Sequence, residues 1–221
     1  VLSGDVNGDD DRTAFTNVND NVNHVLTGDG VNVPTLLDGL VVSGGNANTS
    51  ALDNAVGGGL LNRGGSLTLS NMAFVANGAY SGAGIAHFYT TLRLANVQFL
   101  GNQAMNSGGG SGGGIYVQDG SVNVANSQFV QNHAAAGAGL AAKHTDGAPA
   151  TEAIIAQSEF NGNEASQRGG AVQLLGAPNV RLTDVTFTGN KAADGAALAA
   201  ENSAAAFAKV EWNGNTASNS G

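Results

Sequence analysis

One aromatic–asparagine motif recurs along most of the chain. Its pattern is F-x-x-N-x-A, with Trp replacing Phe in the last copy, and successive aromatic residues lie 25, 30, 31, 27 and 25 residues apart. A fixed period of roughly 20 to 50 residues is the signature of solenoids and arrays, in which each repeat buries its apolar face against its neighbours. The six copies place their aromatic residue and their asparagine at Phe74 and Asn77, Phe99 and Asn102, Phe129 and Asn132, Phe160 and Asn163, Phe187 and Asn190, and Trp212 and Asn215.

A second motif, G-[GA]-[GA]-[ILV], precedes each aromatic residue. It accounts for part of the 34 Gly among 221 residues, which is roughly twice the ordinary share. Between the two motifs apolar residues alternate with polar ones, and this is the period of a β-strand. Each repeat therefore predicts three short strands: one after the Gly turn, one around an aliphatic pair, and one ending on the aromatic residue. The alanine-rich segments 134–142 and 196–206 overlap the Gly motif and are predicted as coil.

Three short strands per repeat, stacked in register, predict an all-β chain folded as a parallel β-helix of about seven coils. We expect the helix to be right-handed, by analogy with parallel β crossovers. The aromatic residues would stack inside it, and the asparagines would form a ladder of side-chain amides along the axis. We expect a single continuous solenoid, with degenerate coils and an acidic turn in residues 1–56 and six regular coils in residues 57–221. In the degenerate part, Val42 stands for the aromatic residue and Gly45 for the asparagine.

Composition excludes several classes of protein. The chain has no Cys, so it has no disulfide scaffold, thiolate zinc site or iron–sulfur cluster. Its net charge of −9 and its lack of basic runs argue against binding to nucleic acid. No apolar run approaches the roughly 18 residues of a membrane span, so we expect no transmembrane segment in this chain.

The clearest local signal for a ligand is an acidic stretch near the N-terminus, Asp5-Val6-Asn7-Gly8-Asp9-Asp10-Asp11. Oxygen-bearing side chains at alternate positions resemble the first half of a calcium loop. The ligands would be Asp5, Asn7, Asp9 and Asp11. However, Gly occupies the fourth position rather than the sixth, and the twelfth position is Thr16 rather than Glu. A solvated acidic turn is the favoured interpretation, and a calcium site is the alternative.

No catalytic arrangement can be argued from the remaining residues. Pectin-degrading enzymes share the β-helix architecture, but this link is a fold analogy only. Glu159 and Asp184 fall on adjacent coils and are the best carboxylate pair, whereas Arg93 and Arg181 do not converge. The four histidines share no repeat position. We therefore expect no catalytic residues, no cofactor and no enzymatic activity.

Two insertions interrupt the regular repeat. Residues 106–114 are Gly-rich but lack the Lys of a phosphate loop, and residues 143–150 form a polar stretch. With Tyr89, these insertions either form a contact surface or are longer turns without a specific role.

Together, F-x-x-N-x-A and G-[GA]-[GA]-[ILV] resemble the repeat of chlamydial polymorphic membrane proteins and related bacterial β-helix proteins. Residues 21–28 and 37–48 are similar to the opening coils of such surface proteins. The resemblance implies a right-handed β-helix on a secreted or outer-membrane protein of a bacterium, often an autotransporter passenger or an anchored adhesin. It implies no reaction.

The expected function is thus a non-catalytic structural or adhesive segment at the outside of a bacterial cell. The alternatives are a polysaccharide-active enzyme, a carbohydrate-binding module, or a structural subunit of a larger extracellular assembly. Partners would be other protein chains or cell-surface glycans. Because solenoids normally protect their ends, we also expect a continuing polypeptide or a partner to cover them.

Overall fold

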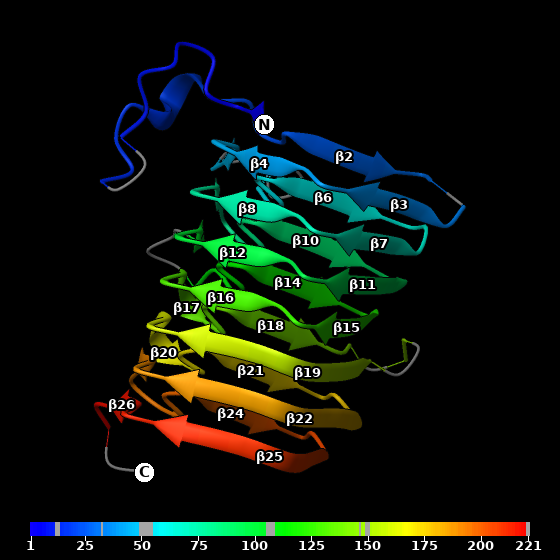
Figure 1. Ribbon diagram of the computed structural model, residues 1–221, viewed down its shortest axis with the longest axis vertical. Helices are drawn as coiled ribbons and strands as arrows, with labels where there is room; N and C mark the ends of the chain where they lie inside the picture. The colour runs from blue at the N-terminus through cyan, green and yellow to red at the C-terminus, as the bar shows by residue number, and fades with distance from the viewer. Residues whose placement is uncertain are drawn as a thin grey trace.

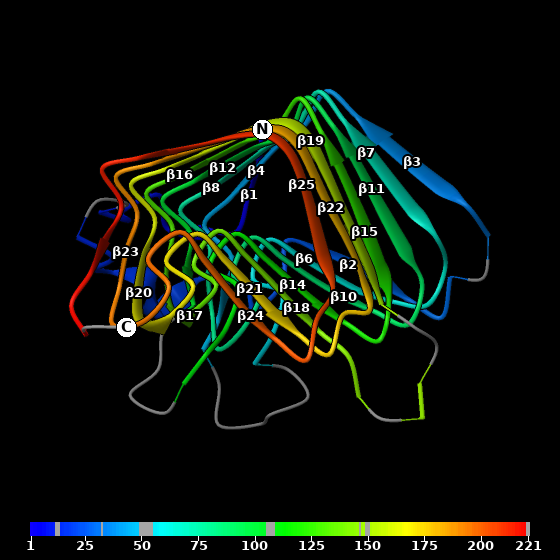
Figure 2. The ribbon, with the colours of Figure 1, turned by 90° about the horizontal axis from the view of Figure 1, so that it is seen from below.

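The chain winds into a right-handed parallel β-helix. The computed structural model describes residues 1–11, 14–31, 33–48, 55–104, 109–145, 147–148 and 151–219. Figure 1 shows the strands stacked from the N-terminus at the top to the C-terminus at the bottom. Seen from the C-terminal end in Figure 2, the chain runs counter-clockwise from β24 through β25 to β26 while it approaches the viewer, which makes the helix right-handed. The predicted all-β, right-handed parallel β-helix is confirmed.

Three sheets form the sides of the solenoid. Sheet I contains β2 (Leu26–Asp29), β6 (Leu60–Arg63), β10 (Ile85–Phe88), β14 (Ile115–Gln118), β18 (Leu140–Lys143), β21 (Val172–Leu175) and β24 (Leu198–Glu201). Sheet II has twelve strands: β1 (Leu2–Ser3), β3 (Thr35–Asp38), β4 (Val41–Ser43), β7 (Leu67–Ser70), β8 (Ala73–Val75), β11 (Thr91–Ala95), β12 (Gln98–Leu100), β15 (Ser121–Ala125), β16 (Gln128–Val130), β19 (Glu152–Asn161), β22 (Asn179–Thr188) and β25 (Ala205–Asn213). Sheet III contains β5 (Asn46–Ala47), β9 (Gly78–Ala79), β13 (Gln103–Ala104), β17 (His133–Ala136), β20 (Glu164–Arg168), β23 (Lys191–Ala192) and β26 (Thr216–Ala217). A single 3₁₀ turn, η1 (Val18–Asp20), lies between β1 and β2 among the described residues.

Sheets I and III each have seven strands, so the described part of the chain makes seven coils, as predicted. The three expected strands of a repeat appear separately in the earlier coils, for example as β6, β7 and β8. In the last three coils the second and third strands join into the long strands β19, β22 and β25. The structure adds a short strand after each of the six ladder asparagines, and these strands form sheet III together with β5, which follows Gly45.

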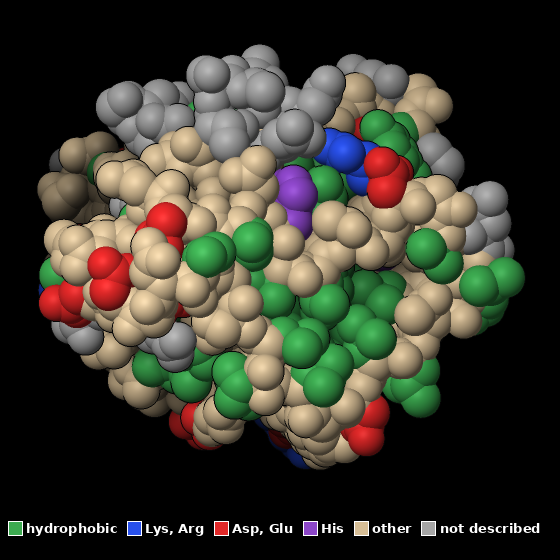
Figure 3. Space-filling view, turned by 90° about the horizontal axis from the view of Figure 1, so that it is seen from above, with side chains coloured by type: hydrophobic (Ala, Val, Ile, Leu, Met, Phe, Trp, Pro, Cys, Tyr) green, Lys and Arg blue, Asp and Glu red, His purple; other side chains and the backbone are tan. Residues whose placement is uncertain are grey.

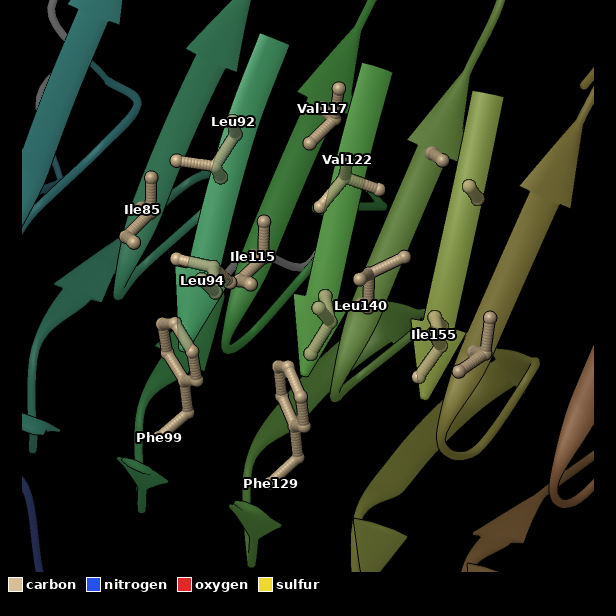
Figure 4. Close-up of a cluster of buried hydrophobic side chains, with 14 of the residues drawn as sticks. Ile85, Leu92, Leu94, Phe99, Ile115, Val117, Val122, Phe129, Leu140 and Ile155 are labelled. Atoms are coloured by element: carbon tan, nitrogen blue, oxygen red, sulfur yellow. The ribbon is translucent and has the colours of Figure 1, made fainter. Parts of the chain in front are cut away.

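A continuous stack of aromatic rings fills one corner of the core. Neighbouring rings from Phe74 to Trp212 lie 5.3, 4.8, 4.4, 5.1 and 4.6 Å apart between centroids, and their planes differ by at most 18°. The five Phe rings of the stack are fully buried. Figure 4 shows Phe99 and Phe129 side by side, with aliphatic residues of neighbouring coils aligned in rows beside them. Strand spacing of about 4.8 Å sets this ring separation, so the backbone register imposes the stack.

The ladder asparagines join the coils, and the amides of the four inner ones are fully satisfied, as Asn102 illustrates. The Nδ2 of Asn102 donates to Oδ1 of Asn132 at 3.0 Å and to the carbonyl oxygen of Phe74 at 2.9 Å. The Oδ1 of Asn102 accepts from both the backbone N–H and the Nδ2 of Asn77. An amide has two donor hydrogens and two acceptor lone pairs, and all four are used here. The side-chain bonds repeat from Asn77 to Asn215 at 2.8 to 3.0 Å.

The alanine-rich segments were predicted as coil, and this prediction is wrong. Segment 134–142 contributes to β17 and β18, and segment 196–206 contributes β24 and the start of β25. Each strand pairs in register with its neighbours, for instance Ala141 with Tyr116 and Gln173. Register with adjacent coils therefore overrides the low strand preference of alanine.

The first coil is degenerate but holds the same register. Val42 pairs with Phe74, and the N–H of Gly45 donates to Oδ1 of Asn77, as the asparagine of a regular coil does. The segment before it lies over β4 and β5: β1 pairs with β4, and Asn46 donates to the carbonyl of Val18. Figure 3 looks onto this N-terminal end and shows apolar side chains at its surface. Partly buried core residues from the first coil are Val25, Leu26, Leu37 and Leu40.

We predict that Asn132→Ala destabilises the fold by about 3 to 5 kcal/mol, because it leaves buried donors and acceptors of two neighbouring coils without hydrogen-bond partners. Its amide bonds Asn102, Asn163 and the carbonyl of Phe99. Urea unfolding followed by circular dichroism measures the effect. The exposed Gln98→Ala is the matched control and should change stability by less than about 0.5 kcal/mol. Equal effects of the two substitutions would contradict the role of the ladder.

Candidate functional site

A row of outward polar residues, most of them amides, runs along the bend between the two halves of sheet II. The backbone conformation of this bend explains much of their residue types, because their φ angles lie between 49° and 57°. Asn and Asp tolerate this left-handed conformation better than other residues with a side chain. The row consists of Asn71, Asn96, Asn126, Gln157, Asp184 and Lys209. The abundance of Asn here therefore follows partly from the turn geometry, so it is a weak sign of a binding face.

The carboxylate pair named from the sequence has other partners. Glu159 accepts a long hydrogen bond from the Nε2 of Gln128 at 3.4 Å, and Asp184 lies 3.4 Å from the Nζ of Lys209. Glu159 lines a shallow amide-rich hollow of about 330 Å³ with Asn126 and other polar residues. An acid–base pair for glycoside cleavage needs two carboxyl groups facing one substrate bond. Asp184 is not among the residues that line this hollow.

The acidic stretch near the N-terminus folds into a different grouping from the predicted one. Asp5 and Asp9 come together with Asp20, and their carboxylate oxygens lie within 4.8 Å of one another. Asp11 instead accepts the N–H of Ala14 at 3.0 Å. Asn7 contributes its backbone N–H, which donates to Oδ2 of Asp20. Asp20 was missed because it is 15 positions from Asp5 and only the turn at η1 brings it back.

Three of the four histidines lie apart on the outer parts of the coils. His24 bonds the carbonyl of Gly57 through Nδ1, and the backbone N–H of His144 donates to Leu175. His133 lies on sheet III, in register with Gln103 and Glu164. Within the described residues, the Asp5, Asp9 and Asp20 group is the one cluster of three or more His, Asp or Glu side chains with ligand spacing.

The fourth histidine is fully buried in a small polar network. Asn62 donates through Nδ2 to the carbonyl of Gly65 and lies 3.0 Å from Nδ1 of His87. The hydroxyl of Thr90 donates to that same carbonyl and lies 3.1 Å from Nε2 of His87. This arrangement requires Nδ1 to accept and Nε2–H to donate, which is the neutral ring. Burial lowers the pKa of His87 from 6.5 to about 4.

The insertions are only partly described. Of the predicted contact surface, residues 106–108, 146 and 149–150 lie outside the described residues. Tyr89 is 62 % exposed, and its ring lies 6.0 Å from that of Phe88. Arg93 and Arg181 share one outward row of sheet II, with Asn123 and Ile154 between them.

We predict a loss of stability on acidification that originates at His87. The unfolded chain protonates this residue near pH 6.5 and the folded chain only near pH 4, so its contribution is complete above pH 6.5 and falls as the pH drops toward 4. The loss amounts to about 3 kcal/mol. Urea unfolding across this pH range measures it. His87→Gln should remove this component and His133→Gln should retain it, whereas the same pH dependence in both variants would contradict the assignment.

We also predict that calcium leaves the melting temperature unchanged. Asp5 and Asp20 already accept backbone N–H groups from Gly8 and Asn7, which is the pattern of a solvated acidic turn. Differential scanning calorimetry with millimolar calcium and with a chelator makes the comparison. A rise in melting temperature with calcium that Asp20→Asn abolishes would overturn this prediction and assign a site to Asp5, Asp9 and Asp20.

Comparison with known proteins gives one match. Residues 96–118 match the model of the family described as the Chlamydia polymorphic membrane protein repeat. The matched stretch contains both sequence motifs, Phe99-Asn102-Ala104 and the turn from Gly112 to Ile115. No curated protein and no solved structure matches the chain. The described residues include no helix long and apolar enough to cross a bilayer. At residues 96–118 the chain therefore carries a repeat of the polymorphic membrane protein type, as its motifs predicted.

Proposed function

We propose that this chain is a non-catalytic structural and adhesive β-helix segment of a bacterial surface protein, exposed outside the cell or at its outer membrane. The observation that carries the proposal is the unbroken interior: one ring stack and one amide ladder run through all six regular coils. The family matched at residues 96–118 is named for membrane proteins of a bacterium. This supports a bacterial surface or membrane-associated protein.

Such an interior favours a stiff rod. Each coil contacts chiefly the coils before and after it, so bending the rod would break ladder bonds and ring contacts together. The polar side chains outside are free to vary without disturbing this interior. A regular solenoid therefore suits a protein that holds a contact surface at a fixed distance and orientation.

The state of the outward carboxylates supports a non-catalytic role. Asp184 is paired with Lys209, and Glu159 is exposed and bonded weakly to an amide. Neither has the buried, apolar surroundings that prepare a carboxylic acid for general acid catalysis near neutral pH. The alternative, a polysaccharide-active enzyme, remains a distinct outcome of the experiment.

We predict that displaying the chain on a non-adherent laboratory bacterium increases its attachment to cultured epithelial cells several-fold. The same chain should release no new reducing ends from polygalacturonate, chitin or hyaluronan. Counting of attached bacteria and a reducing-sugar assay measure the two outcomes. The double substitution Asn102→Ala and Asn132→Ala disrupts the ladder and should abolish attachment at equal surface expression.

Two results would contradict the proposal. Attachment that is no greater than that of the empty display host would remove the adhesive role. Release of reducing ends that disappears in Glu159→Gln would instead favour the enzyme. This substitution is a fair test because Gln128 occupies the same position in the preceding coil, so the fold accommodates the change.

A further inference from the structure

A groove runs along the outer face of sheet I. Four outward residues stand in register on successive strands: Tyr116 on β14, Ala141 on β18, Gln173 on β21 and Ala199 on β24. Two hollows, of about 290 and 530 Å³, lie along this row. Gln173 and Leu175 line both of them, so the hollows meet there. Figure 2 shows these strands of sheet I as one side of the solenoid.

Gln173 is the unusual residue of the groove. It is only 8 % exposed, and within the described part of the chain its amide makes no side-chain hydrogen bond. The small side chains of Ala141 and Ala199 stand on either side of it along the row. The turn at Gly137 lies so close that a Cβ there would come within 3.0 Å of the Cβ of Gln173. The atoms of its amide are not fully buried, because they open into the two hollows that Gln173 lines, so the amide can donate to and accept from a ligand there.

One end of the groove is aromatic. Tyr80 and Tyr116 line the smaller hollow, and the ring of Tyr116 meets Phe88 edge to face at 6.1 Å. The Tyr116 hydroxyl donates to Oε1 of Gln118 at 2.8 Å, and burial raises its pKa to about 12, so it stays protonated at neutral pH. Tyrosine offers an apolar ring face with a polar tip, which suits ligands that carry both C–H faces and hydroxyl groups.

The other end of the groove carries charged side chains whose net charge is zero. Arg168 lies 3.1 Å from Glu201 and 3.9 Å from Asp194, and all three line the larger hollow. Lys143 stands at the rim of the smaller hollow. Two cationic and two anionic side chains leave no net charge, in a chain whose total is −9. These charges offer hydrogen bonds to neutral polar groups and no attraction for an anionic polymer.

We propose that this groove binds a neutral oligosaccharide of about three sugar units, with a sugar face on Tyr116 and hydroxyl groups bonded to Gln173 and to the Arg168–Glu201 pair. Three strand spacings from Tyr116 to Ala199 give a length of about 14 Å. A peptide is a poorer occupant because the backbone groups of β18 and β21 already pair along the axis and cannot accept an added strand. The inference rests on the proposed adhesive function and supplies its contact site.

We predict that maltotriose, cellotriose or N-acetylchitotriose binds the full chain and perturbs the side-chain amide resonance of Gln173. Titration by NMR and calorimetry measures this. Gln173→Ala should weaken binding about fivefold or more, since one or two hydrogen bonds are lost. This variant should fold normally because Ala141 and Ala199 hold the same position in the neighbouring coils. Tyr116→Phe keeps the ring and should have a smaller effect than Tyr116→Leu.

Gln98→Ala and Tyr89→Ala are matched controls, because they remove an exposed amide and an exposed tyrosine outside the groove. Both should leave binding unchanged. Absence of binding for all three sugars at millimolar concentration would overturn the proposal, as would equal losses in Gln98→Ala and Gln173→Ala. Binding of a heparin oligosaccharide or a neutral unstructured peptide in place of the sugars would also overturn it.

The two proposals can fail separately. If no sugar binds but displayed bacteria still attach to cells, the groove is excluded and the adhesive function stands. If a trisaccharide binds through Gln173 but attachment does not rise, the groove stands and the adhesive function fails.

Discussion

The amide ladder is the interaction on which the rest of this structure depends. Asn102 bonds the coils on both sides and the backbone carbonyl of Phe74, so one side chain fixes register, turn and spacing together. Buried amides are costly unless every donor and acceptor is used, and here the stacking of identical residues satisfies them. The aromatic stack follows from that register, because rings at equivalent positions must lie one strand spacing apart.

The difference between a repetitive interior and a variable exterior supports the proposed structural and adhesive function. The interior is repetitive and tolerates few changes, as the buried rings and amides show. One departure from the repeat lies inside, the buried network of Asn62 and His87 in two early coils. The exterior carries the others, an acidic cluster near the N-terminus and a groove on sheet I. A scaffold with a constant interior can vary its outer positions without losing its shape, and this is how a solenoid acquires a contact site.

Much of the fold could be predicted because its signal repeats. Phe99 and Asn102 recur at equivalent places in six copies, so their burial and the parallel coil architecture follow from the pattern. The strands of sheet III were missed because β9 and β13 are two residues long and carry no alternation. The strands at Ala141 and Ala199 were missed because alanine favours no strand by itself and only pairing with adjacent coils holds it there. Asp20 and Gln173 gain their surroundings from turns and neighbouring coils, which no local spacing encodes.

The role of the ladder is tested most directly by hydrogen exchange of its side-chain amides, measured by NMR in the native state. We predict that the side-chain amide protons of Asn102, Asn132 and Asn163 exchange as slowly as the backbone N–H groups of β12 and β16, because both open only when coils separate. The exposed side-chain amide of Gln98 should exchange at the rate of a solvated amide. Ladder amide protons that exchange as fast as those of Gln98 would contradict the claim that these side chains hold the coils together.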